Sequence, residues 1–289
     1  MKRLSSLAAA GAALLALAAP ASAASAAARG DDQVGQRGDV RMLPGMSYIF
    51  FRSAERLDVQ FVREASAAER AEYQAARDAA YVQARSRFER QFARWQREET
   101  QCRGNDAAYC RYRPDRPADV TPETFAYPPL EMVNMLPIAR NPQFTRAEGE
   151  YTYLMAVRPG TYILYGAIAA TDDGPVGVCL CMGSVRFDVP EGRIVDVGEI
   201  RYSPDRTREV PRRNMTSQFL VPATADSPRP DRLAGLTVVP AELRAAGKMP
   251  NFSAVEIDRH PPIEGVLAYE RDRVVDLRAE PAPAATAGN

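Results

Sequence analysis

The pattern of apolar and polar residues changes twice along the chain. Residues 46–53 form an aromatic and β-branched run, and residues 57–63 alternate apolar with polar side chains, so both predict strands. Strand-like runs return from residue 150 onward, separated by turn signals such as Pro159-Gly160. Between these regions the period is helical. The chain therefore predicts a mainly β protein that is interrupted by a helical segment.

The helical segment begins with a capping box. Ser66 and Glu69 have the required spacing, and neither Gly nor Pro follows until Gly104. About 35 helical residues make a rod of roughly 50 Å, longer than a compact domain of this size is wide, so we expect part of it to project. Aromatic residues at helical spacing form one stripe, which we predict to bind a partner: Tyr73, Tyr81, Phe88, Phe92 and Trp95.

A Pro-rich stretch, residues 111–131, follows the helix without any period. Extended at about 3.3 Å per residue, it is long enough to run back along the helix. Its aromatic residues, among them Phe125 and Tyr127, can pack on the helical stripe. We therefore expect residues 66–130 to form an arm, in which a helix runs outward and an extended strap returns.

The second half of the chain predicts antiparallel strands in a meander or Greek key. "DVPEGRIVDVG" is a hairpin signal, and "PAELRAAGKMP" predicts a short helix near residues 240–247. The economical architecture is an antiparallel β-sandwich with an inserted long helical arm. The expected segments are a signal peptide (1–23), a flexible leader (24–45), the sandwich (46–65 and 131–278), the arm (66–130) and a disordered tail (279–289).

The first residues are typical of a secretory signal. Lys2 and Arg3 precede an apolar run, and Ala21-Ser22-Ala23 fits a cleavage site. The apolar run is about a dozen residues, short of the roughly 20 that span a bilayer. We expect cleavage, a periplasmic or secreted protein, and no transmembrane segment in the mature chain.

Charge and motifs narrow the function classes. The chain has 37 basic and 37 acidic residues, so its net charge of zero does not favour nucleic acid or an anionic membrane. No nucleophile elbow, phosphate loop or zinc motif is present. The single histidine, His260, lies among charged residues and prolines and is expected in a loop. We predict no catalytic residue and no cofactor.

The four cysteines form two close pairs. Cys102 and Cys110 close a nine-residue loop at the tip of the arm, where a disulfide is the default in an oxidising compartment. Cys179 and Cys181 point to one face of a regular strand, and a bridge between them would need a kink, which Gly183 could supply. Buried thiols, a cross-bridge to the first pair, a redox pair, and a soft-metal site of Cys179, Cys181 and Met182 remain open.

One part of the chain resembles known folds. "VRPGTYILYGA" followed by "VRFDVPEGRIVDVGEI" is similar to hairpins of immunoglobulin-like and prealbumin-like sandwiches in exported bacterial proteins. The whole chain, with "CLCMGSVRF", resembles an uncharacterised family of such exported proteins. The resemblance implies a scaffold or binding module and transfers no catalytic residue.

Three function classes follow from these patterns. The first is an exported, non-enzymatic scaffold or protein-interaction module of the cell envelope, whose arm engages another envelope protein or a second copy. The second is a copper-binding protein that uses Cys179, Cys181 and Met182. The third is an envelope enzyme of unknown type.

Overall fold

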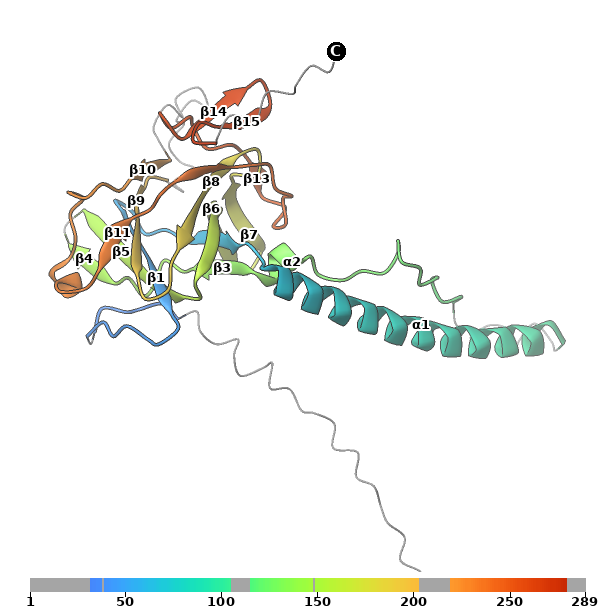
Figure 1. Ribbon diagram of the computed structural model, residues 1–289. Helices are drawn as coiled ribbons and strands as arrows, with labels where there is room; N and C mark the ends of the chain where they lie inside the picture. Colours follow the sequence, from blue (N-terminus) through green and yellow to red (C-terminus); the bar gives the residue numbers. More distant parts are fainter. Residues whose placement is uncertain (1–31, 38, 105–114, 148, 203–218, 280–289) are drawn as a thin grey trace, which may run out of the picture.

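Two mixed β-sheets pack face to face, and one long helix leaves them (Figure 1). The computed structural model describes residues 32–37, 39–104, 115–147, 149–202 and 219–279. The first sheet has the order β10-β9-β1-β5-β4, with β11 also on β9. Its strands are β1 (Ser47–Ser53), β4 (Thr145–Ala147), β5 (Glu150–Val157), β9 (Ile194–Ile200), β10 (Leu220–Pro222) and β11 (Val238–Pro240).

The second sheet has the order β12-β8-β6-β2-β3, with β7 on β6 and β13 on β7. Its strands are β2 (Val59–Arg63), β3 (Met135–Ile138), β6 (Gly160–Thr171), β7 (Gly174–Cys179), β8 (Ser184–Val189), β12 (Arg244–Ala246) and β13 (Glu256–Ile257). A separate hairpin consists of β14 (Leu267–Glu270) and β15 (Arg273–Asp276).

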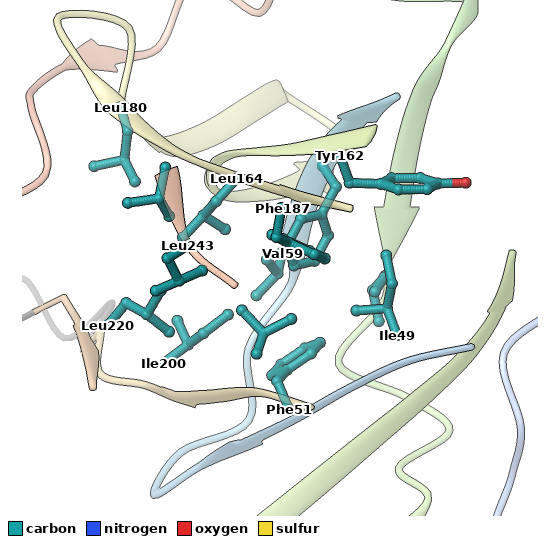
Figure 2. Packing of buried hydrophobic residues seen from close by; sticks show 14 of the residues in the cluster. Ile49, Phe51, Val59, Tyr162, Leu164, Leu180, Phe187, Ile200, Leu220 and Leu243 are labelled. Carbon is teal, nitrogen blue, oxygen red and sulfur yellow. The ribbon is translucent and has the colours of Figure 1, made fainter. Parts of the chain in front are cut away.

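Apolar side chains from both sheets fill one core (Figure 2). The rings of Phe51 in β1 and Phe61 in β2 lie 6.3 Å apart, centre to centre. Phe61 also meets Phe187 of β8 edge to face at 5.8 Å. All three side chains are fully buried. The inward positions of alternating strands therefore form the sandwich core, as expected for two packed sheets.

The outer face of the first sheet is covered as well. Part of the segment predicted as a flexible leader packs on the first sheet, where Val34, Val40 and Met42 contact a cluster around Phe50. The backbone N–H of Val34 donates to the carbonyl of Leu154 at 2.8 Å. The prediction of a flexible leader is therefore wrong for these residues. Because that stretch lacks a period, its pairing with β5 was not visible in the sequence.

The sheets are mixed, which corrects the expectation of purely antiparallel strands. β1 and β9 pair in parallel, as do β11 with β9 and β13 with β7. The predicted hairpin at Pro190-Glu191-Gly192 is also wrong, because β8 lies in the second sheet and β9 in the first. The turn residues mark the reversal correctly. They do not determine which sheet the following strand joins.

The short helix predicted near residues 240–247 is absent, and two strands stand in its place. Pro240 ends β11 opposite Asp196 of β9, and Ala245 of β12 pairs with Val185 of β8. The backbone of this segment therefore joins both sheets. Pairing with existing strands overrides the modest local preference of Ala, Glu and Leu for a helix.

The arm is inserted between two paired strands. β2 and β3 are antiparallel neighbours, with Val62 opposite Met135. The chain leaves β2 into α1 (Ala67–Gly104), a helix of 38 residues or about 57 Å, and re-enters through α2 (Leu130–Val133). Figure 1 shows α1 extending away from the sheets. No helix in the described parts of the chain is long and apolar enough to cross a membrane.

Candidate functional site

The arm is fixed to the sandwich at the start of α1. Ser66 and Glu69 form the predicted capping box: the Glu69 N–H donates to Ser66 Oγ at 3.2 Å, and the Ser66 N–H donates to Glu69 Oε2 at 2.9 Å. Both Glu69 oxygens also accept from Arg63 of β2, at 3.1 and 2.5 Å. These bonds to Arg63, together with the capping bonds, lower the pKa of Glu69 to about 2.

Glu69→Gln is expected to lower the free energy of unfolding by about 1–2 kcal/mol at pH 7, because it removes the carboxylate that accepts two charge-assisted hydrogen bonds from the mostly buried Arg63. Since the folded pKa of Glu69 is depressed, this contribution is full above the unfolded pKa near 4.5 and is lost as the pH falls toward 2. Denaturant unfolding of the parent and the variant at pH 7 and pH 3 measures the loss of stability and its dependence on pH. The control is Glu72→Gln, at an exposed position one turn further along the helix, which should change the free energy of unfolding little. Equal losses in the two variants would contradict a stabilising role of the Glu69–Arg63 contact.

The strap covers the predicted aromatic stripe, as expected from its composition. The ring of Tyr127 lies 5.5 Å from that of Tyr73, and the ring of Phe125 lies 5.5 Å from that of Tyr81. The Tyr73 hydroxyl donates to the carbonyl of Pro128 at 2.8 Å. The stripe is therefore occupied by the chain itself, and helix and strap form one two-layered arm.

The distal part of the stripe is a ladder of stacked rings. Phe88, Phe92 and Trp95 follow one another at 5.6 Å, and the Arg116 guanidinium of the strap lies over Phe92. Cys102, near the end of α1, is disulfide-bonded, while its predicted partner Cys110 lies outside the described residues. A partner-binding role for the five stripe residues stays a prediction. The face that the strap leaves open is the opposite side of α1.

The segment "CLCMG" interrupts what the sequence predicts as one strand. β7 ends at Cys179, a turn closed by the Gly183 N–H and the Leu180 carbonyl follows, and β8 begins at Ser184. Both strands pair with the same edge of β6. The expectation of a continuous strand is therefore wrong. The two cysteines nevertheless share one face, since both lie in the outer cluster while Leu180 enters the core.

The two cysteines are joined. Their Sγ atoms lie 2.07 Å apart, and their Cα atoms are 5.2 Å apart, closer than on a regular strand. Both side chains are buried, whereas Met182 is 37% exposed. In this form neither sulfur is a thiolate, so the soft-metal site predicted from Cys179, Cys181 and Met182 has no anionic ligand to offer. A local disulfide was among the open interpretations of the sequence, and the structure has it.

The turn between β7 and β8 holds the C-terminal part of the chain. The N–H of Asp258 donates to the Cys179 carbonyl, the N–H of Met249 to that of Cys181, and the N–H of His260 to that of Gly183, at 2.8–2.9 Å. The Met182 N–H donates in return to the backbone carbonyl of Asp258 at 3.0 Å. This regular exchange of backbone bonds makes the disulfide segment a structural junction.

His260 is fully buried at this junction, in the loop that the sequence predicts. Its Nδ1 lies 2.6 Å from the Pro261 carbonyl, which fits an N–H donor there, and its ring meets the Phe219 ring at 6.1 Å. Nε2 has no hydrogen-bond partner among the described residues. Burial in this apolar site lowers the pKa of His260, so the ring is neutral at pH 7.

Acid is expected to weaken the fold through His260. Because its folded pKa is depressed, the unfolded state binds the proton first, and stability falls as the pH drops below the unfolded value near 6.5. The measurement is the difference in free energy of unfolding between the parent and His260→Phe at pH 7.5 and at pH 5. That difference should shift in favour of the variant at pH 5. Because the chain has only one histidine, no other imidazole contributes to this difference in free energy of unfolding. A difference that does not change with pH would contradict the depressed pKa of buried His260.

Sequence reasoning missed a buried acidic residue in the first sheet. Asp196 of β9 is fully buried, and its Oδ1 accepts from the Gly198 N–H at 3.0 Å. Burial raises the pKa of this carboxyl, and the nearby charge of Arg52 in β1 opposes that rise. The signal was available: "IVDVG" places one Asp inside an otherwise apolar strand. Asp196 lies opposite Phe50, next to a shift in the β1–β9 register.

An open cleft of about 390 Å³ lies where the arm meets the second sheet. Arg63, Arg70 and Lys248 line it together with Met249 and Asn134. Among the described residues the Asn134 amide nitrogen has no partner, although it is buried. The cleft is open, and its lining also includes the carboxylates of Glu64 and Glu131, so it carries charges of both signs. It suits a contact with a partner better than enclosure of a small molecule.

Comparison with known proteins does not place the chain in a family. No family model, curated protein or solved structure matches it.

Proposed function

We propose that the protein is an exported, non-enzymatic scaffold of the cell envelope, and that its arm carries a protein-interaction surface. The observation that carries this proposal is the arm itself. A helix of 38 residues and its strap pack on each other, and none of their described residues belongs to the sandwich core. Ordering so many residues costs conformational entropy. Since the arm does not stabilise the sandwich core in return, we infer that it serves another role.

The stiffness of the arm supports this role. The strap braces the helix through ring contacts and through Arg85, which donates to the Val120 carbonyl at 3.0 Å. The Glu69–Arg63 pair sets the direction in which the helix leaves the sheets. A pre-ordered arm loses little freedom on binding, which favours its use as a docking element.

The predicted signal sequence supports an exported location, and the disulfide of Cys179 and Cys181 suits an oxidising compartment. We also propose that the sandwich is of the immunoglobulin-like or prealbumin-like kind, on the strength of the sequence resemblance over residues 150–202. The partner is another envelope protein or a second copy of the chain.

Removal of the arm tests the proposal. Residues 66–130 are replaced by a short Gly-Ser linker, which the fold permits because the Arg63 N–H donates to the Asn134 carbonyl at 3.1 Å and β2 and β3 would become an ordinary hairpin. Chemical cross-linking in the native compartment, followed by sedimentation, measures the size of the complex. We expect the shortened protein to remain folded by circular dichroism and to lose its complex. A complex of unchanged size would contradict the proposal.

A further inference from the structure

A row of arginines follows the open face of the arm. Arg87, Arg90, Arg94 and Arg97 recur at spacings of three, four and three residues, so they lie on one side of α1. All four are exposed. At 100° per residue the row is roughly 140° around the helix from the rings that the strap covers, and it is about 15 Å long. The row therefore stays free when the strap is in place.

The positive charge of this row is barely compensated. Arg94 pairs with Glu98 at 2.7 Å, while Arg87, Arg90 and Arg97 form no ion pair with any described residue. By contrast, Arg85 on the flank of the helix pairs with Glu89 at 3.1 Å. Four guanidinium groups in line, about 30 Å or more from the base of the helix, make a distal cationic edge.

The charge around the row points to a narrow anionic partner. The described strap, residues 115–129, carries three carboxylates and one guanidinium, and the whole chain has a net charge of zero. These carboxylates lie on the strap side of the arm, so a broad anionic surface such as a membrane would contact only the single row of guanidinium groups and would gain little. A second copy of the same face would bring like charges together. A single line of carboxylates matches the width of the row and brings no like charges together.

We propose that the arginine row docks an acidic helix of a partner protein, with carboxylates at the matching three-four-three spacing. Two helices have the same rise per residue, so four Glu or Asp side chains on one face come opposite four guanidinium groups. Guanidinium also binds a carboxylate through two parallel hydrogen bonds, which gives direction to the contact. The inference rests on the proposed function of the arm and names the chemistry of its partner.

Binding to a synthetic peptide tests the row. The probe is an Ala-Gln helix with Glu at positions i, i+3, i+7 and i+10, immobilised at high density on a biosensor. The comparison peptide has the same composition with its Glu residues distributed around the helix. The full-length protein should be retained at least about tenfold more strongly by the first peptide, and raising NaCl from about 50 to about 500 mM should abolish the difference.

Two variants make the result specific. The combined change Arg87→Gln, Arg90→Gln, Arg94→Gln and Arg97→Gln should remove the preference. The matched control changes four exposed arginines outside the arm instead and should retain it: Arg37, Arg41, Arg193 and Arg271, each to Gln. Equal retention of the two peptides would overturn the inference. Stronger retention on vesicles of about one quarter phosphatidylglycerol would also overturn it, in favour of a membrane surface.

The native complex separates this inference from the proposed function. If the protein without residues 66–130 loses its envelope complex and the four-Gln variant keeps it, the arm binds a partner by another face and the arginine inference is wrong. If the four-Gln variant loses the complex as well, the inference is supported. If neither loses it, both proposals are wrong.

Discussion

Replacing Gly166 with alanine is expected to lower the free energy of unfolding by about 3 kcal/mol or more, and can prevent folding altogether. A Cβ on Gly166 would lie 2.1 Å from the Val178 carbonyl oxygen and 2.9 Å from the Cys179 Cα. Both are backbone atoms of β7, so no side chain can turn away to make room. The strand itself would have to move, together with the disulfide segment that follows it. Denaturant unfolding followed by circular dichroism measures the loss.

The control for Gly166 is Gly247→Ala. Nothing lies within 4 Å of a Cβ at that position, and its backbone is not in the left-handed region. Alanine there should leave stability within about 0.5 kcal/mol, or raise it slightly by restricting the unfolded chain. A loss of less than about 1 kcal/mol for Gly166→Ala would show that β6 and β7 can separate easily, against the close pairing described here.

The arm could be predicted from the sequence because its determinants are local. The capping box of Ser66 and Glu69 fixes where α1 begins, and the absence of Gly and Pro lets the helix continue to Gly104. The aromatic period identifies one side of the helix. The Pro-rich composition of the strap identifies the segment that covers it, and the contact of Tyr127 with Tyr73 confirms that packing.

The division of strands between two sheets could not be predicted in the same way. Pro159-Gly160 and Pro190-Glu191-Gly192 are correctly identified as reversals, but each connects one sheet to the other. The parallel pairing of β1 with β9 joins residues almost 150 positions apart, as in Tyr48 opposite Ile194. No local pattern encodes such a contact, because it depends on packing of the whole core.

Whether the two cysteines of the "CLCMG" segment form a disulfide depends on the distance between them, which the alternation of side chains along a strand does not reveal. The sequence places both cysteines on one face, and the structure agrees. The turn after β7 brings their Cα atoms to 5.2 Å, and this closer approach accommodates the bridge. The burial of His260 was likewise hidden, since it results from segments far away in the chain.

Gly183→Ala is expected to detach the C-terminal hairpin from the sandwich and to lower the free energy of unfolding by about 3 kcal/mol. Gly183 has a φ of +143°, a conformation that side chains disfavour. A Cβ there would also lie 2.8 Å from both the Tyr269 hydroxyl and a methyl group of Val274. Tyr269 cannot yield without cost, because its hydroxyl donates to the His260 carbonyl at 2.7 Å.

Hydrogen exchange locates this effect, and a second glycine separates its two causes. In Gly183→Ala, the amides of β14 and β15 should exchange faster, while those of β1 and β5 should keep most of their protection. Gly174→Ala carries a similar backbone strain, with a φ of +111°, but nothing lies within 4 Å of its Cβ. Gly174→Ala should therefore cost less and should leave the hairpin protected. If both variants expose β14 and β15 equally, contact between Gly183 and the hairpin is not what holds the C-terminal part in place.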